Sequence, residues 1–324
     1  MTLTIRDVAK KANVSIATVS LAMKDDPRVA ALTRKKVRRI SAQLGYTPSN
    51  LGRALQSSKT RCVGYLLSET TASLFIEILK GVAEQATTKG YGVLVGITDG
   101  SYETEQRLLH LFREKAVDGI LVSNWNAQSV RIMMECSQRG TPMVVCSNTS
   151  FQRTIPNIIL DNKEGGRMAT EHLVGLGHRQ LAFCFAGVQN QRYEGCQAVA
   201  MENKLPHPIS CTSEEDLFQA LKARKRPTGI VAFSDLDAIQ VKHVAQQAGL
   251  RIPEDLSVTG FDNLWVAALP EFNLTTIAQP QREIGLQAME MLWLRMHGET
   301  VQSRILMPTL VIRNSTAPCR PNKA

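Results

Sequence analysis

The chain has 324 residues, of which 44% are hydrophobic and 21% charged, and its formal net charge is +9. That length suffices for one small domain and a larger two-lobed one, and the composition is typical of globular proteins. No run of about 18 apolar residues occurs, which argues against a transmembrane helix, and Met1–Asp7 lacks the apolar stretch of a secretory signal. The seven Cys form no C-x-x-C pair, so we expect reduced thiols in the cytoplasm, with no disulfide framework, metal or cofactor.

The excess positive charge lies entirely in the first fifth of the chain. Residues 1–60 hold six Lys and six Arg against three Asp, whereas the remaining residues carry equal numbers of basic and acidic side chains. A compact basic module on a neutral body is typical of nucleic-acid binders. Charge alone leaves open a solvated basic face or a helix on a membrane surface.

The first predicted helix begins at a capping-box-like sequence. Thr4 is a hydroxyl N-cap, and Asp7 follows three residues later. Apolar residues at helical spacing then form one face, and Asn13 ends the helix. The members of that face are Ile5, Val8, Ala9 and Ala12.

Two further short helices follow. Ser15 can cap the second, whose inward stripe is Val19, Ala22 and Met23, and Asp25-Asp26-Pro27 ends it. The third runs from about Thr33 to Leu44 and is closed by Gly45; Val37, Ile40 and Leu44 point inward. Three short helices with a tight turn between the first two predict a helix-turn-helix unit.

The second helix is the predicted recognition helix. Ile16, Ala17, Ser20 and Leu21 lie opposite its inward stripe and would enter the major groove of DNA. Ser15, Thr18 and Ser20 suit phosphate oxygens. For Ile16 and Leu21 we favour exposure and contact with thymine methyl groups over packing in the core.

The rest of the chain alternates strands and helices. The first series consists of strand 63–67, helix 74–89, strand 93–96, helix 103–115, strand 119–123, helix 127–139 and strand 142–146. The second, from about 162 to 276, includes helix 164–176, strand 181–186, strand 229–233, helix 236–248 and strand 257–261. This rhythm predicts two doubly wound α/β lobes, which place a ligand at the carboxyl ends of their strands, in the cleft between them.

The N-terminal motifs resemble the signature of the LacI/GalR family. The resemblance rests on Thr4–Ser20, Thr33–Val37, Leu44–Ser49 and Leu51–Leu55, and it persists to about Ser315. It implies an all-α headpiece joined to a two-lobed α/β domain like that of periplasmic binding proteins. It further implies a homodimer on double-stranded operator DNA, with a hinge whose Leu55 wedges into the minor groove.

The resemblance also implies site residues and domain boundaries. The DNA-binding candidates are Thr4, Ser15, Ile16, Ala17, Thr18, Ser20, Leu21, Arg34, Asn50, Arg53 and Leu55. The effector-binding candidates are Leu74, Phe75, Asn124, Trp125, Ser147, Asp161, Arg192, Ser234 and Asp262. The boundaries are 1–47 for the headpiece, 48–60 for the hinge, 61–161 with 278–308 for the N-lobe, 162–277 with 309–316 for the C-lobe, and 317–324 for a disordered tail.

Several positions leave alternatives open. Phe75 and Trp125 fit ordinary core or rim packing as well as ligand stacking, whereas for Arg192 and Asp262 we favour a ligand over a structural ion pair. The chain departs from the family pattern in a short loop before Arg192 and in Ser147, where other members often carry Asp. These departures argue against a standard monosaccharide and leave a larger, apolar or anionic ligand, or a pocket without an effector, as possibilities.

Three functions compete on the sequence. The first is a ligand-responsive DNA-binding regulator, most often a repressor in this family, whose effector is a sugar or related metabolite. The second is a solute-binding protein of the same two-lobed fold, which the basic headpiece opposes. The third is an enzyme on a doubly wound fold, for which the sequence shows no catalytic constellation.

Overall fold

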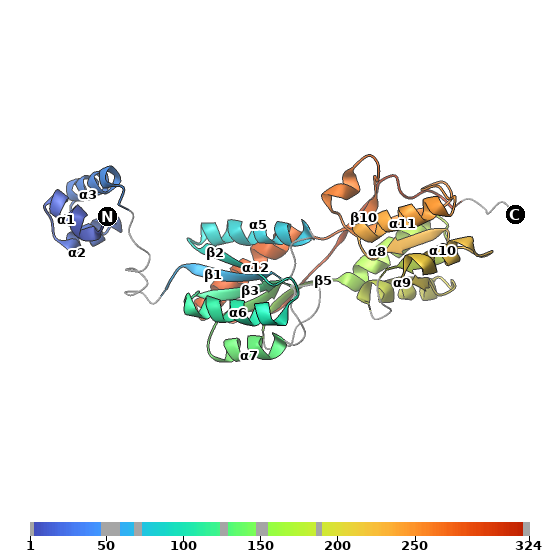
Figure 1. The fold of residues 1–324 in the computed structure, drawn as a ribbon, viewed down its shortest axis with the longest axis horizontal. Coiled ribbons are helices and arrows are strands. Elements are labelled where there is room, and N and C mark those ends of the chain that lie inside the picture. Colours follow the sequence, from blue (N-terminus) through green and yellow to red (C-terminus); the bar gives the residue numbers. More distant parts are fainter. Residues whose placement is uncertain are drawn as a thin grey trace. The chain divides into compact units, whose positions relative to one another are not determined.

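The computed structural model describes residues 3–46, 59–67, 73–123, 129–146, 155–185 and 190–319, with the backbone alone at Ser73 and Leu74. The chain divides into two compact units, Met1–Thr60 and Arg61–Ala324 (Figure 1). Each is described by itself.

The first unit is a bundle of three short helices, α1 (Ile5–Ala12), α2 (Ile16–Met23) and α3 (Ala31–Leu44). Their core consists of buried Val8, Ala9, Ala12, Val19, Ala22, Val29, Val37 and Ile40. The predicted helix-turn-helix is confirmed, as is the closure of α3 by Gly45, whose φ of 66° is left-handed. The expected start of α3 at Thr33 is wrong: the helix begins at Ala31 without a side-chain cap.

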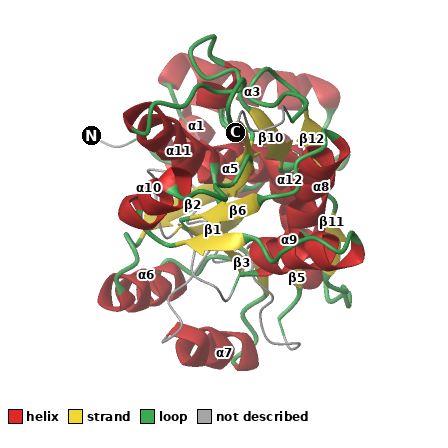
Figure 2. Ribbon diagram, turned by 90° about the vertical axis from the view of Figure 1, so that its right-hand side faces the viewer, coloured by secondary structure: helices red, strands yellow, loops and turns green. Residues whose placement is uncertain are grey.

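The second unit contains two six-stranded sheets. The first has the order β11-β5-β4-β3-β1-β2, and all of its pairings are parallel. Its strands are β1 (Cys62–Leu67), β2 (Gly92–Ile97), β3 (Gly119–Ser123), β4 (Met143–Cys146), β5 (Asn157–Leu160) and β11 (Arg304–Leu306). Helices α5 (Ser73–Thr88) and α12 (Gln281–Met296) pack on one face, and α6 (Tyr102–Glu114) and α7 (Val130–Gln138) pack on the other (Figure 2).

The second sheet has the order β12-β10-β9-β8-β6-β7 and is parallel except for β12, which runs antiparallel to β10. Its strands are β6 (Leu181–Cys184), β7 (Ile209–Cys211), β8 (Gly229–Ala232), β9 (Ser257–Asp262), β10 (Thr275–Ala278) and β12 (Thr309–Val311). Helices α8 (Asn162–Gly175) and α9 (Gln191–Glu202) cover one face, and α10 (Glu214–Lys222) and α11 (Asp235–Gln247) cover the other. A short 3-10 helix, Trp265–Ala268, follows β9.

The chain passes between the two sheets three times, after β5, after β10 and after β11. The late segments therefore cross back to the first sheet, as expected. The prediction that a disordered tail begins at residue 317 is wrong, however. The Ala317 N–H donates to Ser257 Oγ at 3.0 Å, and the Cys319 N–H donates to the Leu176 carbonyl at 2.8 Å, so these residues are ordered against the second sheet's lobe.

Among the helices that the structure describes, none has both the length and the apolar character needed to span a bilayer. All seven Cys lie in the described residues, and all are free thiols.

Candidate DNA-binding surface and effector site

The N-terminus of α2 is fixed by two hydroxyl side chains. Ser15 is the N-cap, and its Oγ accepts a hydrogen bond from the Thr18 N–H at 3.0 Å. The same oxygen lies 2.8 Å from Thr18 Oγ1. The first of these bonds satisfies a backbone donor that a helix start leaves unpaired, and together they fix both hydroxyls at the start of α2.

The outward side of α2 carries a small apolar surface. Ile16 is 45% exposed and Ala17 is exposed, whereas Ser20 is half-buried. The expectation that Leu21 is exposed is wrong, because its side chain is half-buried and packs against the headpiece core. The exposed apolar surface of α2 therefore centres on Ile16 and Ala17.

All three headpiece carboxylates are held by neighbouring groups. Asp7 accepts from the N–H and the hydroxyl of Thr4 at 2.8 and 2.7 Å, which lowers its pKa. Asp26 forms two hydrogen bonds with the Arg28 guanidinium, which lower the pKa of Asp26 to about 2. Arg38 forms an ion pair with Asp25.

Seven exposed basic side chains therefore remain without an ion pair among the residues that the structure describes. They are Arg6, Lys10, Lys11, Lys24, Lys35, Lys36 and Arg39. Because these cations are not neutralised, they give the headpiece a strongly positive surface for phosphate. Arg34, a predicted DNA contact, donates from Nη1 to the Asp25 carbonyl at 2.8 Å, which ties α3 to the end of α2. The predicted hinge contacts Asn50, Arg53 and Leu55 lie outside the described residues, as does the predicted hinge as a whole except Lys59 and Thr60.

In the larger unit, Arg192 lies in the first turn of α9 and is only 4% exposed. Its Nε donates to Asn162 Oδ1 at 2.9 Å, and Nη1 donates to the Phe233 carbonyl. The guanidinium carbon is 3.6 Å from the centroid of the Phe261 ring and 4.6 Å from that of Phe233. This stacking suits a planar cation that stays charged when buried.

Asp262 ends β9 and lies beside Arg192. Its Oδ1 is 3.8 Å from Arg192 Nη2 and accepts a hydrogen bond from Gln279 Nε2. Burial raises the pKa of Asp262 to about 6, although Arg192 and Gln279 favour its ionised form. The carboxylate of Asp262 therefore lies beside a buried cation, with which it forms a long ion pair.

The start of α11 adds two more carboxylates. Ser234 caps this helix, accepting from the Asp237 N–H at 3.1 Å and donating to Asp237 Oδ2 at 2.5 Å. Asp235 is fully buried, and it accepts from Thr276 Oγ1 at 2.5 Å and from the Leu264 N–H at 2.7 Å. Burial nevertheless raises the pKa of Asp235 to about 7 and also raises that of Asp237.

Arg192, Ser234 and Asp262 thus meet at the carboxyl-end edge of the second sheet, where doubly wound folds bind ligands. Two other predicted residues have structural contacts of their own. Phe75 is 8% exposed within the core under α5, which favours the core-packing alternative. Asp161 caps α8 by accepting from the Glu164 N–H at 2.9 Å. Asn124, Trp125 and Ser147 and the side chain of Leu74 lie outside the described residues.

Sequence reasoning missed Gln279 and Asp237. Gln279 follows β10 in the strand-connecting segment, and nothing in its sequence pattern marks it. Asp237 belongs to the cap of α11, and its position three residues after Ser234 was a usable signal.

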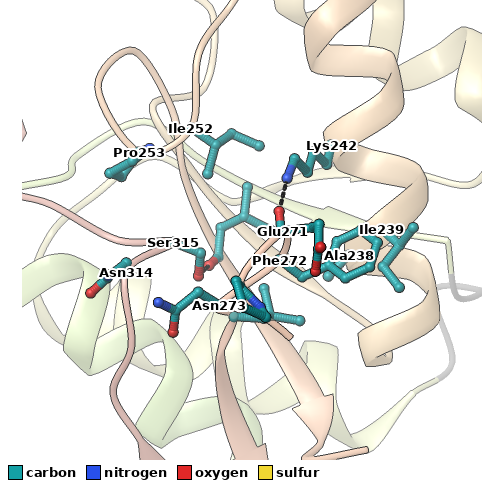
Figure 3. Close-up of a pocket in the computed structure, with 13 residues that line it drawn as sticks. Ala238, Ile239, Lys242, Ile252, Pro253, Glu271, Phe272, Asn273, Asn314 and Ser315 are labelled. Atoms are coloured by element: carbon teal, nitrogen blue, oxygen red, sulfur yellow. Dashed lines mark hydrogen bonds between the residues drawn. The ribbon is translucent and has the colours of Figure 1, made fainter. Parts of the chain in front are cut away.

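The structure also holds a separate cavity of about 190 Å³ under α11 (Figure 3). Lys242, Phe272, Asn273 and Asn314 line it, and the Lys242 ammonium donates to the Glu271 carbonyl. It shares no lining residue with the group around Arg192 and Asp262.

The comparisons with known proteins agree with this architecture. The profile of the bacterial regulatory proteins of the lacI family matches residues 4–49, and that of the periplasmic binding protein-like domain matches residues 170–316. The HTH-type transcriptional repressor PurR of Aliivibrio fischeri (strain ATCC 700601 / ES114) is 33% identical over 334 residues, which cover 97% of this chain and 98% of PurR. The chain belongs to the LacI family.

Other relatives of this LacI-family member cover nearly its whole length. Catabolite control protein A of Priestia megaterium is 31% identical, with 94% of this chain and 96% of that protein covered. Among solved structures, the Lac repressor dimer bound to operator and the anti-inducer ONPF shares 26% identity with a TM-score of 0.85, covering 98% and 100% of the two chains. The LacI-family chain described here is accordingly a DNA-binding transcription regulator with a helix-turn-helix headpiece and an effector-binding domain.

Proposed function

We propose that this protein is a transcriptional repressor that binds operator DNA as a homodimer through its headpiece. The observation that carries the proposal is the headpiece itself, in which every carboxylate is held internally while seven exposed basic side chains have no ion pair among the described residues. Relatives named as repressors, and a Lac repressor dimer bound to operator, support it.

Helix α2 enters the major groove with its N-terminal end first. Ile16 and Ala17 contact base edges, and Ser15, Thr18 and Ser20 contact phosphate oxygens together with Thr4 and Arg34. Asn50, Arg53 and Leu55 of the hinge contact the minor groove, where Leu55 wedges into a central base step.

The effector is a small molecule, a sugar or related metabolite, held by Arg192, Ser234 and Asp262, with predicted contributions from Leu74, Asn124, Trp125, Ser147 and Asp161. It binds one relative arrangement of the lobes more tightly and so changes the spacing of the paired headpieces. The protein acts in the cytoplasm, by binding and not by catalysis, and the two-fold axis of the dimer is matched by the symmetry of the operator.

A gel shift on the promoter upstream of the protein's own gene tests this function. We expect a specific complex whose affinity falls by about 1,000-fold between 50 and 200 mM salt, as roughly six phosphate contacts require. A scrambled duplex of the same length is the control for specificity. Equal binding of both duplexes, or no complex at low salt, would contradict the proposal.

A further inference from the structure

Two cysteines lie side by side at the carboxyl-end edge of the second sheet. Cys184 is the last residue of β6 and Cys211 is the last residue of β7, and the two are register partners in the parallel pairing of these strands. Register partners on neighbouring strands project from the same face of the sheet, and both side chains lie in the core that α10 and α11 cover. None of the other five cysteines has a cysteine as its register partner.

The spacing of the two strands suits a disulfide. Neighbouring strands lie about 4.8 Å apart, and a disulfide joins residues whose Cα atoms are about 4.4–6.8 Å apart. The Phe185 N–H donates to the Cys211 carbonyl at 2.7 Å, so the pairing of β6 and β7 continues past both cysteines. A bond between the two sulfur atoms therefore needs no separation or sliding of the strands.

The two thiols also interact with each other. A hydrogen bond from the Cys184 side chain lowers the pKa of the Cys211 thiol, whereas burial raises the pKa of Cys184. The thiolate is the nucleophile in thiol oxidation and exchange. Cys211 is therefore the attacking sulfur, and Cys184 stays protonated beside it until the second step.

Both side chains are buried, so a reagent reaches them through local opening at the edge of the sheet. Strand β7 is an edge strand of three residues, and its first residue, Ile209, is 38% exposed. Thr212 and Ser213, directly after Cys211, are exposed. Short edge segments open at a lower free energy than the centre of a sheet, so Cys211 is the sulfur that such an opening uncovers first.

We propose that Cys184 and Cys211 are an oxidation site, which forms a reversible disulfide when the protein meets a hydroperoxide. In the first step the Cys211 sulfur attacks one peroxide oxygen and the O–O bond breaks. This gives a sulfenic acid on Cys211 and, from hydrogen peroxide, one water. In the second step the Cys184 sulfur attacks the Cys211 sulfur, the S–O bond breaks, and the hydroxyl leaves as water with the Cys184 proton. Two thiols thus lose two electrons, and one peroxide gains them.

This oxidation site lies near the effector group. The negative charge of Asp237, which is hydrogen-bonded to Ser234, contributes to the raised pKa of Cys184. Strand β6 continues in the chain to Arg192, eight residues after Cys184. The disulfide therefore ties the edge strand to the strand that leads to Arg192. The proposal does not depend on DNA binding, and its tests need no effector.

Oxidation of the folded, full-length protein with a small excess of hydrogen peroxide tests the pair. We expect the free thiols to fall from seven to five, with a loss of about 2 Da from the chain and recovery on addition of dithiothreitol. Mass spectrometry of unreduced peptides should show Cys184 linked to Cys211. Seven thiols that persist after treatment, or a disulfide between other cysteines, would overturn the proposal.

Three serine variants assign the roles of the two sulfur atoms. Cys184→Ser should stop at the sulfenic acid of Cys211, which dimedone traps, whereas Cys211→Ser should give neither a disulfide nor a dimedone adduct at Cys184. Cys196→Ser, at another buried thiol of the same lobe, is the matched control and should form the disulfide as the wild-type protein does. A dimedone adduct at Cys184 in Cys211→Ser and none at Cys211 in Cys184→Ser would contradict the assignment. Circular dichroism verifies that each variant is folded, and if one is not, the linked peptides of the wild-type protein decide alone.

Discussion

Two side chains on one helix face have different roles because their burial differs. Ile16 is 45% exposed, whereas Leu21, five residues later, packs against the headpiece core. Helical periodicity alone placed both on the outer face. Burial of Leu21 depends on how α1 and α3 meet α2, and a single helix pattern carries no information about that.

This difference in burial predicts that substitution of Ile16 affects operator binding, whereas substitution of Leu21 affects stability. Ile16→Ser should weaken operator binding by about 10-fold, the loss expected of an apolar base contact, with little change in stability. Leu21→Ala should lower the free energy of unfolding by about 1–2 kcal/mol, because it removes partly buried methyl groups. Gel shift and urea denaturation measure the two effects. Loss of stability in Ile16→Ser with unchanged operator affinity would show that the assignment of the two residues is reversed.

Asp235 predicts how stability depends on pH. Burial raises its pKa in the folded protein to about 7, above the value of about 4 in an unfolded chain. The folded state therefore binds the proton more tightly, so the contribution of this group to stability is present at acidic pH and is lost as the pH rises through 7.

Relative to Asp235→Asn, the free energy of unfolding of the wild-type protein should fall by about 1 kcal/mol between pH 6.5 and pH 8. Urea denaturation at both pH values gives the difference, and Asp216→Asn, on an exposed helix cap, is the control. A wild-type protein that gains stability over this range relative to Asp235→Asn would have the wrong sign for a buried carboxyl.

At the scale of elements, helices α8 and α9 cross at a glycine from each helix, and this crossing sets the position of Arg192. A Cβ on Gly166 of α8 would lie 2.0 Å from the Arg192 carbonyl, and one on Gly195 of α9 would lie 2.1 Å from the Lys163 carbonyl. Gly166 therefore permits close packing of the two helices. The backbone of α9, the helix that carries buried Arg192, therefore packs directly against the backbone of α8.

Gly166→Ala should force the helices apart and move Arg192 away from Asn162. We expect a loss of about 2–3 kcal/mol in the free energy of unfolding, since overpacking a rigid backbone contact costs about that much, together with weaker effector binding. Gly175→Ala, at the end of the same helix with open space around it, is the control and should be neutral or stabilising. Equal stability of the two variants would contradict the close crossing.

Helix α3 begins without a side-chain cap, at Ala30. Ala30→Ser supplies a hydroxyl at the N-cap and should stabilise the headpiece by about 1 kcal/mol. Ala31→Ser, one residue inside the helix, should not. Thermal unfolding of the two variants separates a capping effect from a general effect of serine, and a matching gain in both would contradict the N-cap position.

The predictability of the elements follows from their periodicity. The strands and helices from β1 to β4 and the helices of the headpiece have strong apolar patterns, and the structure contains them with boundaries shifted by a few residues. The sequence patterns predicted no element at β5, α9, β7, α10, β10, α12, β11 or β12. Helix α9 is amphipathic only weakly because its buried residues include Arg192 and Gly195, and β7 is a three-residue edge strand, shorter than a reliable alternation. The start of α3 was missed because the helix begins without a side-chain cap, so no capping residue marks it in the sequence.

At the scale of the whole molecule, charge and binding chemistry are divided between the two units. All of the net charge of +9 lies in residues 1–60, and the larger unit is neutral overall yet gathers carboxylates around Arg192 and Asp262. This division was predictable, because charge and motifs can be read along the chain. The effector group was predictable only in part: Arg192, Ser234 and Asp262 follow from the resemblance, whereas the partner of Asp262, Gln279, is set by where β10 ends.

The most direct test of the account compares the full-length protein with residues 61–324 in fluorescence anisotropy on operator duplex. Circular dichroism first verifies that the shorter chain keeps its α/β fold. The account predicts salt-sensitive, sequence-specific binding by the full chain and a loss of at least about 1,000-fold in affinity when the headpiece is absent. Undiminished binding of the duplex by residues 61–324 would contradict it.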